Sequence, residues 1–180
     1  MNKSLIRKKI LRIRKKNNSK KLKINFKDLL DVLKNENIKG KNIGGYYPYN
    51  YEVDVIKILK EFEKKKYLIS LPKIKGNFQM DFFEWSLNNP LIINAYGIPE
   101  PVSNKKIYPD ILLVPLVAFD NKLNRIGYGG GFYDRYIKKI KRKKKITTIG
   151  LAFSFQEVKK IETNKFDIKL DFIVTEKKRI

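Results

Sequence analysis

The chain concentrates glycine in one short segment that could bind an anion. RIGYGGGFYDRYI, residues 125–137, holds four of the ten glycines of the chain. An apolar run precedes this segment and a helical pattern follows it. Glycine lets backbone N–H groups approach an anion without a side-chain clash, and the amino end of the following helix adds partial positive charge. The segment therefore predicts a phosphate site at the end of a strand.

Two familiar phosphate motifs do not account for this segment. The third glycine of a dinucleotide fingerprint would fall on Phe132, and the Gly-Lys-Ser/Thr of a P-loop does not occur. A tight glycine turn without a ligand stays open as an alternative. Asp134 favours the phosphate site, because a carboxylate next to phosphates is a natural Mg²⁺ ligand, although it could also serve only as a helix cap.

Composition limits the available chemistry. The chain has neither cysteine nor histidine, which excludes disulfides, thiolate metal sites, a cysteine nucleophile and the commonest general base. Catalysis would depend on carboxylates, amines, phenols, backbone donors or a metal held by oxygen. The basic N-terminal segment lacks the apolar core of a signal peptide and no run has the length of a membrane span, so we expect a cytoplasmic protein without a membrane partner.

The formal net charge of +23 raises the question of a polyanionic partner. Lysine supplies 34 of the 41 basic residues, and alanine occurs only 3 times. This bias is typical of codons rich in A and T, and we interpret the charge mainly as compositional. The alternative function is a basic RNA-binding protein that uses the N-terminal helix and Lys138–Lys145. No usual RNA-recognition motif or interleaved aromatic platform supports that alternative.

The elements that must position the glycine segment alternate between helix and strand. The patterns predict helices over residues 3–16, 25–40, 53–66, from 133 onward and over 154–161. They predict strands over residues 42–49, 67–72, 78–85, 111–119, 146–153 and 171–175, with Pro72 and Pro115 at strand ends and a loop over 97–110. Alternation indicates an α/β fold with a mostly parallel central sheet, and the length of 180 residues indicates one domain, 1–180.

Residues 111–137, ILLVPLVAFDNKLNRIGYGGGFYDRYI, resemble the signature of the 5-formyltetrahydrofolate cyclo-ligase family, whose members are also called methenyltetrahydrofolate synthetases. Five further segments are similar to the family: KSLIRKKILRIRKK, YEVDVIKIL, GIPEP, GLAFSFQE and KLDFIVT. The resemblance implies a Rossmann-like three-layer α/β/α sandwich. It also implies an enzyme that converts 5-formyltetrahydrofolate and ATP to 5,10-methenyltetrahydrofolate, ADP and phosphate with Mg²⁺.

The resemblance assigns roles to individual residues. It implies that ATP contacts Lys3, Arg7, Arg125, Ile126, Gly127, Tyr128, Gly129, Gly130, Gly131, Phe132 and Tyr133. It implies that the folate contacts Tyr47, Glu52, Tyr128, Gly129, Gly130, Gly131 and Phe132, with Glu52 near the formyl group. Asp134 and Asp171 are the implied Mg²⁺ ligands.

The remaining expectations concern Arg135, Gly130, the oligomeric state and the binding partners. Arg135 would pair with phosphate or brace Asp134. Some family members have lysine where this chain has Gly130, so one cationic phosphate contact is missing here and nearby lysines would replace it. We expect a monomer whose partners are 5-formyltetrahydrofolate and ATP, with no specific nucleic acid.

Overall fold

A seven-stranded sheet forms the centre of the molecule. The computed structural model describes residues 2–17 and 22–180, and the strand order is β11-β10-β7-β1-β2-β3-β6. The strands β11, β10, β7, β1 and β2 pair with one another in parallel, whereas β3 pairs antiparallel with both β2 and β6. Their bounds are β1 Asn42–Gly44, β2 Leu68–Lys75, β3 Gln79–Glu84, β6 Lys106–Ile107, β7 Ile111–Pro115, β10 Thr147–Leu151 and β11 Phe172–Val174.

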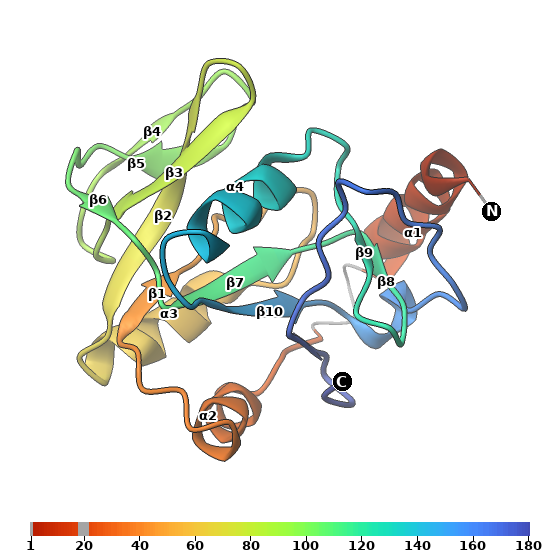
Figure 1. Cartoon of the computed structure of the whole chain (residues 1–180), viewed down its shortest axis with the longest axis horizontal. Coiled ribbons are helices and arrows are strands. Elements are labelled where there is room, and N and C mark those ends of the chain that lie inside the picture. The colour runs from red at the N-terminus through yellow and green to blue at the C-terminus, as the bar shows by residue number, and fades with distance from the viewer. Residues whose placement is uncertain (1, 18–21) are drawn as a thin grey trace.

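Helices cover both faces of this sheet. On one face, α2 (Phe26–Asn35) and α3 (Val55–Lys64) bury their apolar residues against Ile43, Ile69 and Leu113. On the other face, α4 (Phe132–Lys141) packs Ile137 and Ile140 against Leu112 and Val114 of β7. Figure 1 shows α4 in front of the sheet and α3 behind it. The predicted α/β/α layers and the mostly parallel sheet are confirmed.

The first helix, α1 (Lys3–Asn17), lies beside the end of the sheet and covers neither face (Figure 1). Ile6 and Ile10 pack on Val117 and Ile126, which belong to a small hairpin region formed by β8 (Ala118–Phe119) and β9 (Arg125–Ile126). This hairpin continues the chain from the carboxyl end of β7. The apolar stripe of α1 therefore fixes a strongly basic helix next to the segment that leads into the glycines.

Several predicted boundaries are wrong for identifiable reasons. The helix predicted over 25–40 is capped by Asn25 as expected but ends at Asn35, and Gly40 packs against Asp110. The strand β2 continues past Pro72. The backbone N–H of Ile74 lies on the same edge of β2 as position 72, and it donates to Glu100 instead of to β3. A proline at position 72 therefore removes no hydrogen bond of the β2–β3 ladder. The predicted helix over 154–161 is a single 3₁₀ turn, η2 Ser154–Gln156.

The segment 97–110 is not only a loop. It contains β5 (Pro99–Pro101), which pairs with β4 (Leu91–Ile93), and it contains the edge strand β6. None of the helices described here is long and apolar enough to cross a membrane.

Candidate functional site

The glycine loop, residues 127–131, connects β9 to the amino end of α4. Gly131 is the N-cap of α4 in the left-handed conformation (φ 66°), and no side chain caps the helix there. Gly129 has a φ of 108°, a conformation that L side chains rarely adopt. No hydrogen bond within the described part of the chain uses the N–H groups of residues 128–130. The loop therefore offers backbone donors and an open helix amino end to an anion.

Two cations from α1 lie at this loop. The Arg7 Nε donates a hydrogen bond of 2.8 Å to the carbonyl oxygen of Gly127, and its guanidinium would be 3.6 Å from a Cβ built on Gly129. Lys3, one turn earlier, pairs with the carboxylate of Asp167. The structure thus brings Arg7 to the glycine loop and Lys3 to Asp167, and the packing of α1 closes the sequence separation of 120 residues between Arg7 and Gly127.

A carboxylate sits in the first turn of α4 and is held rigidly. Asp134 Oδ1 accepts a hydrogen bond from Arg125 Nη2 at 2.9 Å and another from the backbone N–H of Ile168 at 3.0 Å. The Arg125 side chain is only 4% exposed, and burial lowers its pKa while Asp134 opposes that shift. Arg125 is therefore a buried brace for Asp134, a role that the sequence analysis considered for Arg135.

Asp171 does not join Asp134. Its carboxylate accepts hydrogen bonds from the N–H and hydroxyl of Thr148 and lies 3.3 Å from Lys141 Nζ. Thr148 is at the amino end of β10 and Lys141 is the last residue of α4, about 10 Å along the helix axis from Asp134. The two implied metal ligands are therefore at opposite ends of α4.

Asp167 is the carboxylate that the structure places near Asp134 instead. It pairs with Lys3, and its neighbour Ile168 binds Asp134 through the backbone N–H and Arg125 through the carbonyl oxygen. Burial opposes ionisation of Asp167, but hydrogen bonds from Lys3 and the Asn164 N–H outweigh it and leave the pKa below its ordinary value. The segment KFDIKLDF contains both aspartates, and only the fold shows which one faces the glycine loop.

Aromatic side chains form a wall on the other side of the loop. The Phe132 ring contacts the rings of Phe78 and Tyr96, with centroid distances of 6.0 and 6.1 Å. The guanidinium of Arg135 lies over Phe78 and Phe132 and donates to the carbonyl oxygens of Phe78 and Gly130. Arg135 therefore holds the glycine loop against the β2–β3 turn.

The Phe132 ring of this wall also occupies the space beside Gly130, the position where some family members have lysine. A Cβ on Gly130 would be 2.7 Å from the Phe132 ring, so a longer side chain would require that ring to move. Arg7 and Lys3 bring positive charge to the loop from α1. That nearby lysines supply the missing charge stays a prediction.

A second loop, residues 45–54 between β1 and α3, carries Glu52. The backbone N–H of Tyr49 donates to Glu52 Oε2 at 2.9 Å. Burial raises the pKa of Glu52 from 4.5 to about 7, although that hydrogen bond and the positive charge of Arg14 oppose the shift. Tyr47 is half-buried in the same loop. Glu52 is thus a carboxyl group able to exchange a proton near neutral pH.

The two loops meet through their tyrosines. The rings of Tyr49 and Tyr128 pack edge to face at 5.7 Å, and the Tyr128 hydroxyl lies 3.4 Å from the carbonyl oxygen of Tyr49. The hydroxyl of Tyr133 is buried and has no hydrogen-bond partner in the described structure. Glu52 contributes to the raised pKa of Tyr128 and Tyr133 after burial itself, so the carboxylate and the glycine loop share one region.

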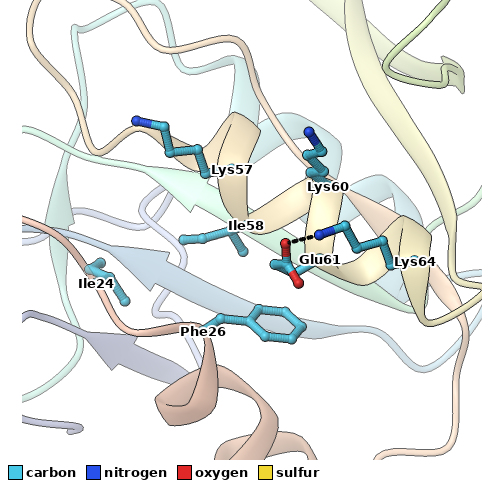
Figure 2. Close-up of a pocket in the computed structure, with 7 residues that line it drawn as sticks. All are labelled: Ile24, Phe26, Lys57, Ile58, Lys60, Glu61 and Lys64. Atoms are coloured by element: carbon cyan, nitrogen blue, oxygen red, sulfur yellow. Dashed lines mark hydrogen bonds and ion pairs between the residues drawn. The ribbon is translucent and has the colours of Figure 1, made fainter.

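One hollow lies apart from the glycine loop. A hollow between α2 and α3, shown in Figure 2, is lined by Ile24, Phe26, Lys57, Ile58, Lys60, Glu61 and Lys64. It includes none of the glycine-loop residues, and its Lys64–Glu61 pair is an ordinary surface contact. Within residues 2–17 and 22–180, no three carboxylates cluster to hold a metal by themselves.

The family model and the curated relatives that resemble this chain in sequence carry the same family name. A model of the 5-formyltetrahydrofolate cyclo-ligase family matches residues 1–176. The 5-formyltetrahydrofolate cyclo-ligase of Haemophilus influenzae is 34% identical over 143 residues, which are 75% of each chain. The enzyme of the same name from Mycoplasma genitalium is 31% identical over 135 residues, 74% of this chain and 72% of its own.

Solved structures resemble the whole chain. The NMR structure of Aquifex aeolicus 5,10-methenyltetrahydrofolate synthetase has a TM-score of 0.75 at 31% identity and covers 99% of this chain and 92% of its own. A 5,10-methenyltetrahydrofolate synthetase from Mycoplasma pneumoniae has a TM-score of 0.74 at 25% identity, with 98% and 99% covered. With its glycine loop and the family match over nearly its full length, the chain belongs to the 5-formyltetrahydrofolate cyclo-ligase family.

Proposed function

We propose that this protein uses ATP to convert 5-formyltetrahydrofolate to 5,10-methenyltetrahydrofolate, releasing ADP and phosphate. One observation carries the proposal most directly. The free backbone donors of residues 128–130 lie next to the amino end of α4, with Arg7 bound to Gly127, Asp134 in the first turn of the helix, and the Lys3–Asp167 ion pair joined to Asp134 through Ile168. These features favour a site for a triphosphate and its metal.

The reaction requires activation of a poor leaving group. The formyl oxygen attacks the γ-phosphorus of ATP, and the bond to the bridging oxygen breaks to release ADP. N10 then attacks the formyl carbon and loses its proton, and phosphate leaves with the former formyl oxygen. Phosphoryl transfer depends on positioning and charge neutralisation more than on a protein nucleophile, so a chain without histidine or cysteine can perform it.

The residues fit a magnesium ion that is held jointly with ATP. Mg²⁺ in such sites is usually bound by one or two carboxylates together with substrate phosphates and water. Asp134 and Asp167 would hold the ion in this way. When bound, the ion would neutralise charge that develops on the transferred phosphoryl group.

The folate side of the site has a candidate base and a flat apolar surface. A carboxyl group with a pKa of about 7 can accept the N10 proton near neutral pH, and Glu52 has this property. Phe132 and Tyr96 offer ring faces suited to a planar pterin or aminobenzoyl group. Tyr47, from the same loop as Glu52, remains a predicted wall of the folate pocket.

The direct test is the appearance of methenyltetrahydrofolate absorbance when the purified protein meets 5-formyltetrahydrofolate, ATP and Mg²⁺. We expect product only when all three are present, and loss of product when Mg²⁺ is chelated. Asp167→Asn should lose most activity, whereas Asp171→Asn should keep most of it, since Asp171 lies at the other end of α4. A folded wild-type protein that forms no product would refute the proposal.

The RNA-binding alternative loses support from the placement of its basic residues. On α1, Arg7 binds the glycine loop and Lys3 pairs with Asp167. In the basic run of residues 138–145, Lys139 pairs with Asp81, Lys141 with Asp171 and Lys144 with Asp110. Cytoplasmic location, a monomeric state and a single domain over 1–180 remain predictions, and gel filtration would test the second of these.

A further inference from the structure

Arg14 is the largest fully buried side chain of the described structure, although it belongs to a surface helix. It lies on the inner side of α1 and is 1% exposed. Burying a guanidinium costs several kcal/mol unless it is paired and hydrogen-bonded. The role of Arg14 is therefore a separate question from the roles of Lys3 and Arg7, which contact the phosphate end of the site.

The hydrogen bonds of Arg14 join three segments. Its Nη1 donates to the hydroxyl of Tyr128 at 3.0 Å, and its Nη2 donates to the carbonyl oxygen of Leu116 just after β7. Tyr128 belongs to the glycine loop, and its ring packs edge to face against the ring of Tyr49. Arg14 therefore ties α1 to the glycine loop at the point where that loop meets the loop of Glu52.

The charge of Arg14 acts on Glu52. Glu52 is attracted to Arg14, and that attraction lowers the pKa of the carboxyl against the larger effect of burial. Three other titratable groups are coupled to Glu52, namely Tyr46, Tyr128 and Tyr133, and burial raises the pKa of each, so all three are neutral near pH 7. Arg14 supplies the positive charge that makes an ionised Glu52 tolerable in this region.

The geometry of the contacts requires arginine and not merely a cation. Two acceptors on separate segments are reached by the two Nη atoms of one planar fork, which the single ammonium of lysine does not reproduce. The Arg14 Nε is buried without a partner in the described structure.

We propose that Arg14 is a positioning residue that fixes the glycine loop against the Glu52 loop and supplies the counter-charge for the Glu52 carboxylate. The inference rests on the proposed function, in which Glu52 accepts the N10 proton. It assigns to a residue outside the phosphate and folate contacts the task of coupling the two halves of the site.

The first experiment compares the steady-state kinetics of Arg14→Met, Arg14→Lys and a control, Arg12→Met, which removes an exposed arginine from the same helix. We expect Arg14→Met to lower kcat about 100-fold, with less than about a threefold change in the KM for ATP because Arg7 and Lys3 remain. The pH midpoint of kcat/KM for the folate should rise by about one unit. Arg14→Lys should keep the wild-type midpoint but lose about tenfold in kcat, and Arg12→Met should behave as wild type.

Two results would overturn the proposal. One is a kcat within about twofold of wild type in Arg14→Met. The other is an equal loss at every pH together with a lower melting temperature, which would mark Arg14 as purely structural. If Arg14→Met does not fold, wild-type activity of Arg14→Lys would overturn the proposal instead.

A second experiment needs no turnover. Melting temperatures at pH 8 of Arg14→Met, Glu52→Gln and the double variant form a cycle. We expect Glu52→Gln to raise the melting temperature by at least about 3 °C more in the Arg14→Met background than in wild type. Equal increments would show that the two side chains do not interact and would overturn the proposal. A wild-type protein without methenyltetrahydrofolate formation would instead refute the proposed function, and the cycle would still measure the coupling.

Discussion

Replacing Glu52 by glutamine should stabilise the fold while it removes the proposed base. The pKa of Glu52 rises from 4.5 to about 7 on folding because the carboxyl is buried. A raised carboxyl pKa means that the folded state prefers the protonated form, so the ionised form is a cost to stability. That cost is absent below pH 4.5, grows between pH 4.5 and 7, and is complete above pH 7.

The size of the effect follows from the same two values. A shift from 4.5 to about 7 corresponds to about 3 kcal/mol. Glu52 is partly exposed, and solvent screening reduces this to roughly 2 kcal/mol. For a chain of this length, that raises the melting temperature by roughly 4–8 °C at pH 8. The glutamine oxygen can still accept the hydrogen bond from the Tyr49 N–H, so the loop keeps its geometry.

The assay is thermal or urea unfolding of wild type and Glu52→Gln at pH 8 and pH 4.5, together with the methenyltetrahydrofolate assay. We expect a stabilised, inactive variant at pH 8 and nearly equal stabilities at pH 4.5. Asp54→Asn is the matched control, because Asp54 is an exposed carboxylate two residues away whose pair with Lys57 is on the surface, and its substitution should change stability by less than about 0.5 kcal/mol. The same gain at both pH values, or none at either, would refute the assignment of Glu52 as a buried, protonatable group.

Three further outcomes are expected. Asp134→Asn should abolish Mg²⁺-dependent turnover and also cost about 3 kcal/mol in urea unfolding, because Arg125 would be left buried without its partner charge; a variant as stable as wild type would contradict the brace. Asp81→Asn should lower the free energy of unfolding by about 1–2 kcal/mol at pH 7. Burial raises the pKa of Asp81, but the ion pairs with Lys139 and Lys106 outweigh burial and lower the pKa to about 2. The difference between variant and wild type should disappear as the pH falls from about 4 to 2, and urea titrations in which it persists would exclude this contribution. Gly129→Val should weaken ATP binding at least about tenfold by calorimetry, because valine rarely adopts a φ of 108°, and unchanged affinity would count against the glycine loop as the phosphate site.

Periodic patterns were enough to predict the layers, because burial on helices and strands leaves a regular trace in the sequence. Ile111–Pro115 forms a central strand and Asn25 caps α2 as expected. Short edge elements escaped prediction, since pairs such as Pro99–Pro101 with Leu91–Ile93 depend on a partner strand more than on their own residues. Pro72 predicts a strand end that the structure does not have, because the sequence does not show which edge of β2 lies open.

At the site, the sequence signal is clear where the signature is contiguous and weak where the contact is distant. The glycines, Asp134 and Phe132 are close in sequence, and the structure keeps them together. The choice between Asp167 and Asp171 depends on how the last segment packs against α4 and α1, and no local pattern encodes that. Arg14 was missed because an arginine in a basic helix has no mark that distinguishes it from its exposed neighbours.

Both ends of the chain contribute to the glycine-loop region. Lys3 reaches Asp167 across 164 residues of sequence, and Arg14 reaches Tyr128 across 114. Pairings of such long range form late and slowly during folding. A chain growing from its N-terminus therefore carries its first basic helix unpaired until almost the entire polypeptide exists. In the proposed function, a prematurely terminated chain that lacks Asp167 has no such partner for Lys3 and should bind ATP more weakly than the 180-residue chain.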